Sequence, residues 1–196
     1  PVLQHIAEGQ FGTQKRRQIR ALVLTPTREL AAQIGDNVEA YAQHLNIRHT
    51  VIFGGVKQGA QVRTLQRGVD VLIATPGRLL DLQNQGHIDL GHVEFFVVDE
   101  ADRMLDMGFI HDVRRVLKTR PRDRQNLLFS ATMPESIVKL ASSFLTDPVS
   151  IEVTPEATTV EAIAQRHSPL ISLISTWAPI CRPLEKNESP WMILWR

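Results

Sequence analysis

The sequence predicts an α/β protein built on a doubly wound, mostly parallel sheet. Between residues 19 and 153, short apolar or β-branched runs alternate with amphipathic helical stretches. Strands that alternate with helices form parallel sheets covered by helices on both faces. The run at 93–98, rich in valine and phenylalanine, is typical of a strand buried inside such a sheet.

Six such runs are the expected strands, and turn residues separate them from the helices. They span residues 21–25, 50–53, 69–74, 93–98, 126–129 and 149–153. Helices are expected where apolar residues recur three or four positions apart. That spacing holds for Leu30, Ile34, Val38 and Tyr41, and again for Phe109, Val113, Val116 and Leu117.

Residues 167–196 depart from this pattern. All three tryptophans of the chain lie there with several prolines, and neither the strand period nor the helix period persists. We therefore expect one partial globular domain over residues 1–166. The remainder, 167–196, is expected to be a divergent tail, disordered or foreign to the domain.

Composition excludes several classes of protein. The single cysteine, Cys181, excludes an internal disulfide framework and fits a cytoplasmic location. No apolar run approaches the ~20 residues that span a bilayer, so no membrane segment is expected. The net charge of +1 neither requires nor excludes nucleic acid as a partner. A basic cluster that includes Arg17 and Arg20 is interpreted as solvated surface.

Three carboxylates within four residues, Asp99, Glu100 and Asp102, follow the expected strand at 93–98. Open α/β sheets bind ligands at the carboxyl ends of their strands. An aspartate there can hold Mg²⁺, usually through water, and a neighbouring glutamate can orient or deprotonate an attacking water. The same acids are also typical of a helix N-terminus, where negative charge favours the helix dipole. The acids alone leave both interpretations open.

One short pattern occurs twice: a strand, a Thr-Pro step, and an arginine two positions after the proline. The copies are Thr25-Pro26-Thr27-Arg28 and Thr75-Pro76-Gly77-Arg78, with Gly54-Gly55 between them. Threonine caps helices and proline favours the first helical position, so free N–H groups and a guanidinium can meet one anion. Paired glycines let a sugar-phosphate backbone approach closely. Each copy alone also suits ordinary helix capping, but together they predict clamps for successive phosphates of a nucleic-acid strand.

Five short motifs stand in one order along the chain: Pro26-Thr27-Arg28-Glu29-Leu30, Gly54-Gly55, Thr75-Pro76-Gly77-Arg78, Asp99-Glu100-Ala101-Asp102 and Ser130-Ala131-Thr132. In residue identity and in order they resemble a known family, the DEAD-box ATP-dependent RNA helicases, over residues 1–166. Residues 101–109 are most similar to its bacterial RhlE-type branch. The resemblance implies the first, N-terminal RecA-like lobe of an enzyme that couples RNA-stimulated ATP hydrolysis to RNA duplex unwinding.

The resemblance also implies a role for each matching residue. Asp99 would hold Mg²⁺, through water, against the phosphates of ATP, and Glu100 would activate the hydrolytic water. Asp102 would pair with the hydroxyls of Ser130 and Thr132 and so couple the nucleotide site to domain closure. RNA backbone, without regard to base sequence, would be contacted by Pro26, Thr27, Arg28, Gly54, Gly55, Thr75, Gly77 and Arg78.

The sequence departs from the family in three respects. It lacks a phosphate loop of the form G-x-x-x-x-G-K-[ST], the upstream glutamine segment that recognises adenine, and the second lobe. Residues 1–6 are similar to the helix that follows that loop, so we expect a P-loop NTPase lobe truncated before its phosphate-loop strand. That strand is expected beside the run at 93–98, so its loss should expose Phe95 and Val97.

Without the loop and its lysine, ATP has almost nothing to bind, so the chain alone is expected to be catalytically inactive. Its phosphate clamps would survive this loss. The alternatives are therefore a non-catalytic RNA- or partner-binding module, or a gene remnant with no independent role.

Overall fold

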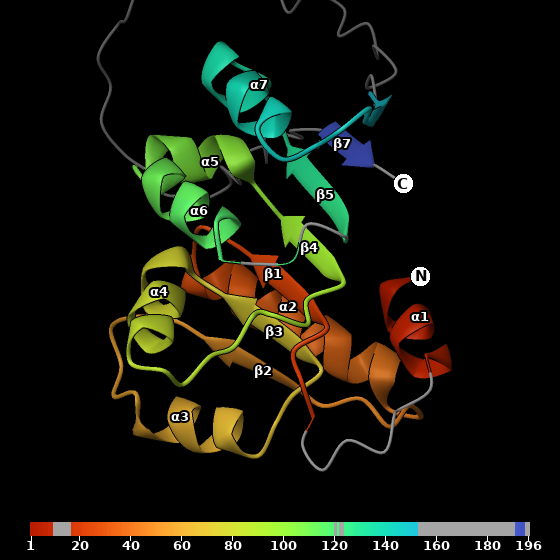
Figure 1. The fold of residues 1–196 in the computed structure, drawn as a ribbon, viewed down its shortest axis with the longest axis vertical. Helices are drawn as coiled ribbons and strands as arrows, with labels where there is room; N and C mark the ends of the chain where they lie inside the picture. The colour runs from red at the N-terminus through yellow and green to blue at the C-terminus, as the bar shows by residue number, and fades with distance from the viewer. Residues whose placement is uncertain (10–16, 120, 122–123, 153–190, 195–196) are drawn as a thin grey trace, which may run out of the picture.

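The computed structural model describes residues 1–9, 17–119, 121, 124–152 and 191–194, and its fold is drawn in Figure 1. Its strands are β1 (Ala21–Leu24), β2 (His49–Ile52), β3 (Val71–Ala74), β4 (Phe95–Val98), β5 (Gln125–Ser130), β6 (Val149–Ile151) and β7 (Trp191–Leu194). Its helices are α1 (Val2–Glu8), α2 (Arg28–Ala42), α3 (Gly59–Gln66), α4 (Pro76–Asn84), α5 (Ala101–Asp106), α6 (Ile110–Leu117) and α7 (Glu135–Ser142). Within this described part, no helix combines the length and the apolar character that a bilayer crossing requires.

The strands form one sheet in the order β2-β3-β1-β4-β5-β7-β6. From β2 to β5 the neighbouring strands are parallel, and their register aligns Leu24 at the end of β1 with Ala74 of β3 and Val98 of β4. The chain leaves β1 for β2 and β3 on one side and then crosses to β4 on the other. The order therefore reverses between β1 and β4, which is where open α/β sheets bind ligands.

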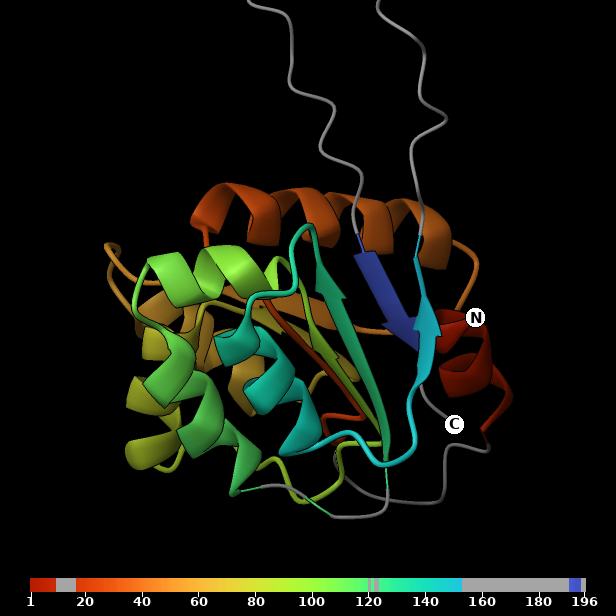
Figure 2. The same cartoon turned by 90° about the horizontal axis from the view of Figure 1, so that it is seen from above.

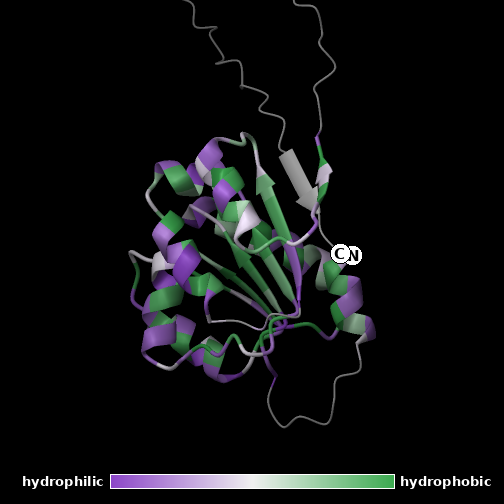
Figure 3. Ribbon diagram, turned by 45° about the horizontal axis from the view of Figure 1, so that its top comes forward, coloured by the Kyte–Doolittle hydropathy of each residue, from purple (hydrophilic) through white to green (hydrophobic). Residues whose placement is uncertain are grey.

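Helices cover both faces of the sheet (Figure 2). Ala21 and Phe95 pack with Ile6 on the side of α1 and α2. Their neighbours Leu22 and Phe96 join the larger core on the other side, to which α3 to α7 contribute. Figure 3 shows the resulting pattern, with hydrophobic strands enclosed by helices that carry hydrophilic residues. This is the doubly wound α/β fold that the sequence predicts.

All six strands predicted from the sequence are present, with ends that differ by at most two residues. Both amphipathic runs are helical, as α2 and α6. Tyr41 departs from the expected apolar stripe of α2, because it is 73% exposed while Ala42 is buried. The buried stripe advances by four residues from Ile34 to Val38 to Ala42, which turns Tyr41 away from the sheet.

The expectation that β4 would lack a neighbour is wrong. β4 pairs with β1 on one side and with β5 on the other, so its backbone groups are satisfied. Phe95 is only 6% exposed, because α1 covers it and the His5 ring contacts its ring edge-on with centroids 5.2 Å apart. Val97 is half-buried.

Most of the predicted tail, 167–196, lies outside the described residues, so the domain boundary after residue 166 stays a prediction. The described exception is β7, which pairs antiparallel with β5 on one side and with β6 on the other. The backbone at residues 191–194 therefore continues the sheet.

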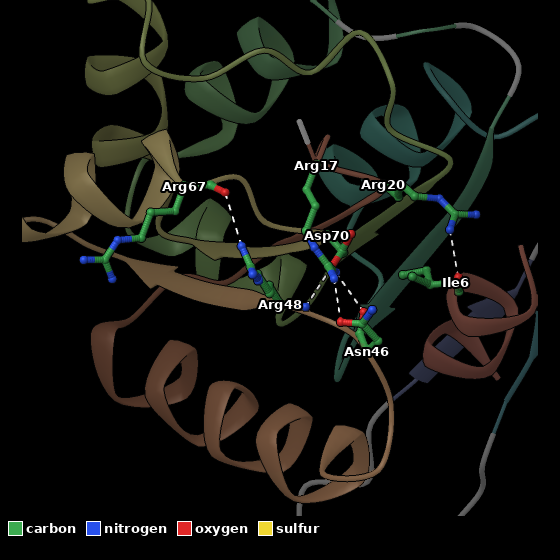
Figure 4. Close-up of polar contacts among 7 residues, drawn as sticks. All are labelled: Ile6, Arg17, Arg20, Asn46, Arg48, Arg67 and Asp70. Atoms are coloured by element: carbon green, nitrogen blue, oxygen red, sulfur yellow. Dashed lines mark hydrogen bonds and ion pairs between the residues drawn. The ribbon is translucent and has the colours of Figure 1, made fainter. Parts of the chain in front are cut away.

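Ion pairs hold the edge of the sheet at which the strands begin, and Figure 4 shows the surroundings of Arg17 and Asp70 and the contact of Arg20 with Ile6. The buried Asp70 carboxylate pairs with Arg17. Arg20 donates two hydrogen bonds to Glu94, at 2.6 and 2.9 Å, and a third to the carbonyl of Ile6 at 2.8 Å. The interpretation of Arg17 and Arg20 as solvated surface is therefore wrong, since both side chains fasten segments together.

Candidate functional site

The carboxyl ends of β1 to β5 lie along one edge of the sheet, opposite the ion-paired edge. The hydrogen-bond ladder extends from the strands into the predicted motifs. The Thr25 N–H donates to the Ala74 carbonyl (3.0 Å), and the Asp99 N–H donates to the Leu24 carbonyl (2.9 Å). The structure therefore places the acids, both Thr-Pro-Arg turns and Gly54-Gly55 along a common edge.

Glu100 turns the chain from β4 into α5 through a left-handed backbone conformation, with φ 48° and ψ 55°. A non-glycine residue pays roughly 1–2 kcal/mol for that conformation. The Glu100 N–H donates to Oδ1 of Asp99 (3.0 Å), and its carboxylate accepts from Arg103 (3.2 Å). Sequence reasoning missed Arg103, although its position three residues along a helix from Glu100 is a usable signal.

The electrostatics of Asp99 favour a cation. Burial is the main cause that raises the pKa of Asp99; the N–H of Glu100 opposes this shift, and the Glu100 charge adds to it. A bound cation would stabilise the charged carboxylate and offset its desolvation. Oδ2 of Asp99 has no hydrogen-bond partner among the described residues, so it can accept from a metal-bound water.

Asp102 joins α5 to the segment that follows β5. Its carboxylate accepts from the N–H of Thr132 (2.8 Å) and from the Thr132 hydroxyl (2.9 Å). Ser130 takes part differently: its hydroxyl accepts from the Asp102 N–H (3.1 Å) and donates to the Thr132 carbonyl (2.7 Å). Burial alone would raise the pKa of Asp102, but hydrogen bonds, led by that from the Thr132 hydroxyl, lower it below its ordinary value.

The two Thr-Pro-Arg turns are less alike than the sequence suggests. In the second, Thr75 is the N-cap of α4 and Pro76 its first residue, as predicted. In the first, Thr25 is buried, and Thr27 is the N-cap of α2, accepting from the Leu30 N–H (3.2 Å). The expectation that the first Thr-Pro step caps its helix is therefore wrong. One turn places its arginine at the first helical position and the other at the third.

Because the two arginines stand at different positions of their helices, their surroundings differ. Arg28 is exposed and its guanidinium lies over Gly55, because a Cβ built on Gly55 would stand 3.1 Å from Nη1. Gly55 also has φ +79°, a conformation that suits glycine. A Cβ on Gly54 or Gly77 would meet nothing within 4 Å, so both backbones are open to a ligand.

Arg78 is largely enclosed, with a side chain only 12% exposed. It donates to the carbonyl of Val56 (3.0 Å) and to the amide oxygen of Gln61 (3.2 Å), and Asp81 lies 3.6 Å away. Sequence reasoning missed Gln61 and Val56, and no local pattern marks them. Arg78 is thus held in position by protein groups beside the glycine pair.

The described residues fit only half of a nucleotide site. Mg²⁺ at a phosphotransfer site commonly takes one or two carboxylates, with waters and substrate phosphates as its other ligands. Asp99 can serve in that way, and the described residues contain no group of three side chains that could hold a metal by themselves. The sequence supplies no phosphate loop for the other half.

Comparisons with known proteins agree with this geometry. Residues 1–140 match the family model described as DEAD/DEAH box helicase. The chain is 49% identical to the ATP-dependent RNA helicase DBP2 of Chaetomium thermophilum over 132 residues. This alignment covers 67% of the chain and 24% of that relative.

Two crystal structures share the fold. One is a DEAD box protein from the hyperthermophile Methanococcus jannaschii, with TM-score 0.64, 43% identity, and coverage of 67% of this chain and 36% of that one. The other is a hypothetical ATP-dependent RNA helicase from Sulfolobus tokodaii, with TM-score 0.61 and 39% identity. The match covers 66% of this chain and 39% of that one. The chain thus spans well under two thirds of each of these relatives.

Proposed function

Because the chain belongs to the DEAD/DEAH box helicase family, we propose that it provides the RNA-binding edge of the first RecA-like lobe of an ATP-dependent RNA helicase. Such an enzyme hydrolyses ATP in response to RNA and separates short RNA duplexes. The name of the fungal relative supports this proposal. Since the chain spans 24% of that relative, the activity of a whole enzyme is proposed here and not transferred.

The observation that carries the proposal is the shared edge. Parallel strands bring the Thr-Pro-Arg turns, the glycine pair and the acids to one side of the sheet. The first N–H groups of a helix have no intrahelical partner, so the starts of α2 and α4, together with the exposed Arg28, suit phosphates, which carry no base information. The RNA-contacting residues in this proposal are Pro26, Thr27, Arg28, Gly54, Gly55, Thr75, Gly77 and Arg78.

The acidic end of β4 is the nucleotide half of the proposal. Asp99 would hold Mg²⁺ through water, and Glu100 would take the proton of the attacking water. The hydrogen bonds of Asp102 to Thr132 and Ser130 would pass changes at the acids to the segment after β5. ATP would be the source of the transferred phosphoryl group.

We propose that this chain by itself turns over no appreciable ATP. A general base adds perhaps 10²–10⁴-fold to the rate, but only for a substrate that is already bound. The sequence contains no phosphate loop and no lysine to reach the β and γ phosphates. The residues proposed to contact RNA phosphates do not depend on that loop. The chain alone is therefore proposed to be a non-catalytic module that binds RNA without regard to base sequence.

Three finer assignments belong to this proposal. Residues 101–109 support the bacterial RhlE-type branch. The change of composition after residue 166 supports a partial lobe over 1–166 and a divergent tail over 167–196, of which residues 191–194 pair with the sheet as β7. The single cysteine supports a cytoplasmic location, which cell fractionation tests.

Salt dependence of RNA binding tests the RNA half. Fluorescence anisotropy with a short single-stranded RNA should give a log–log slope near −3 if about four phosphates are neutralised, at roughly −0.7 each. Arg28→Ala should weaken binding and reduce the slope by about 0.7. Arg114→Ala, which removes an exposed arginine of α6, is the matched control and should change neither. A flat salt response, or equal effects of the two variants, would overturn RNA binding at this edge.

Phosphate release tests the nucleotide half. With Mg²⁺, ATP and RNA, the chain should release no phosphate above the level of its Glu100→Gln variant. Turnover at the rate of an intact helicase, lost in that variant, would show that the chain binds ATP in another way.

A further inference from the structure

Gln61, in the first turn of α3, joins two parts of the proposed RNA edge. Its amide NH₂ donates to the carbonyl of Phe53, the residue that follows β2 (3.1 Å). Its amide oxygen accepts from the Arg78 guanidinium in the first turn of α4 (3.2 Å). One half-buried side chain therefore ties the backbone before Gly54-Gly55 to the arginine of the second Thr-Pro-Arg turn.

The link depends on the chemistry of an amide. Gln61 is a donor toward a carbonyl and an acceptor toward a guanidinium at the same time. A carboxylate of the same length has no N–H for the carbonyl, and an apolar side chain satisfies neither partner. Asparagine has both groups but is one methylene shorter. The position is thus chemically specific, unlike a surface site that any polar residue could fill.

The other partners of Arg78 show what Gln61 contributes. The carbonyl of Val56 draws the guanidinium toward the glycine loop (3.0 Å), whereas Asp81, further along α4, attracts it along its own helix (3.6 Å). Asp81 carries a full charge, and Gln61 and Val56 offer only neutral oxygens. Without Gln61, Val56 and Asp81 would remain as partners of the guanidinium, and we expect the charge of Asp81 to draw it away from the loop.

We propose that Gln61 is a positioning residue for RNA binding, which acts by holding the Arg78 guanidinium beside the Gly54-Gly55 loop without touching RNA itself. The inference rests on the proposed function. Groups that are fixed before a ligand arrives lose less conformational freedom on binding, so a held guanidinium gives tighter binding than a mobile one. Loss of one hydrogen bond to a charged group corresponds to about tenfold in affinity.

Gln58 provides a matched control. It is the N-cap residue of α3, and its amide exchanges hydrogen bonds with that of Gln85 after α4 (2.8 and 3.3 Å). It is thus the same residue type, three positions away, and also bridges α3 and α4. It makes no hydrogen bond to Arg78 or to Phe53 among the described residues.

Anisotropy with a short single-stranded RNA, at one fixed salt concentration, tests the inference on the full chain. We expect Gln61→Ala to raise Kd about tenfold and Gln58→Ala to change it less than twofold. A double-mutant cycle supplies a readout that a merely structural role would not give. If Gln61 acts through Arg78, the double variant should bind no more weakly than Arg78→Ala alone. Thermal melts of all variants should show that each is folded.

The outcomes separate the inference from the proposed function. Equal affinities of Gln61→Ala and the wild-type chain would overturn the inference and leave RNA binding intact. Additive losses in the cycle would also overturn it, since Gln61 would then act independently of Arg78. No RNA binding by the folded wild-type chain would overturn the proposed function, and the role of Gln61 with it.

Discussion

Asp102 shows how one carboxylate can join distant parts of the chain. It receives the N–H and the hydroxyl of Thr132, thirty residues further on, at 2.8 and 2.9 Å. Despite partial burial, which alone would raise the pKa of Asp102, these donors lower it. The bonds are therefore strongest when the carboxylate is ionised.

Thr132→Val should lower the free energy of unfolding by about 1 kcal/mol at pH 7, because it removes one donor from a partly exposed charge. The folded pKa of Asp102 lies below its unfolded value. Its contribution is therefore present above the unfolded pKa and is lost as the pH falls through the folded pKa. Urea unfolding should show the gap to wild type shrinking below about pH 4.

Thr64→Val is the control, since its hydroxyl donates to the neutral carbonyl of Ala60 (3.2 Å) and to no carboxylate in the described part of the chain. Its effect should not change with pH. A gap for Thr132→Val that stays constant from neutral to strongly acid pH would contradict the ionic character of the bond.

The glycine pair offers a second contrast between neighbouring residues. Gly55→Ala should lower stability by roughly 1–2 kcal/mol, because its φ is +79° and the new methyl group would press on Arg28. Gly54→Ala meets open space and should leave the melting temperature nearly unchanged. Equal melting temperatures for the two variants would contradict the backbone geometry of this loop.

At the scale of elements, the two helix starts of the edge are capped in different ways. The side chain of Thr27 accepts from the Leu30 N–H, whereas Thr75 makes no side-chain cap bond to α4. Thr27→Ala should therefore cost about 1 kcal/mol of stability through the loss of the cap. Thr27→Ser keeps the hydroxyl and should restore most of it in urea unfolding. Equal losses in the alanine and serine variants would show that the cap contributes nothing.

The sequence could predict the strands and the edge, but not the details of the turns. Parallel strands put all their carboxyl ends on one side, so the order of motifs already placed them together. Whether a helix begins at Thr25 or at Thr27 depends on local packing, here the burial of Thr25. The enclosure of Arg78 by Gln61 depends on how α3 and α4 pack, which no sequence period records.

At the scale of the whole molecule, a strand remote in sequence stands between β5 and β6. β7 pairs with both of them through its backbone. The family resemblance predicts that β4 loses one neighbour, the phosphate-loop strand that the sequence lacks. The sheet instead keeps β4 paired on both sides and accepts β7 beyond β5.

Ending the chain after Pro190 should expose the edges of β5 and β6. Unpaired strand edges lose backbone partners and promote pairing between molecules. We expect a melting temperature lower by at least about 3 °C and more association in analytical ultracentrifugation. Removal of residues 195–196 alone, which leaves β7 in place, is the control. Unchanged melting and unchanged association after the longer deletion would show that β7 adds nothing to the sheet.

The central claim is that nucleic acid binds at the edge where the strands end, and amide NMR during an RNA titration tests it most directly. Glycine signals are well separated and mark both edges: Gly54, Gly55 and Gly77 on the proposed edge, and Gly68, packed against Arg17, on the opposite one. We predict progressive shifts of the first three signals and none for Gly68. Shifts confined to Gly68, or no shifts at all, would contradict the assignment of this edge to RNA.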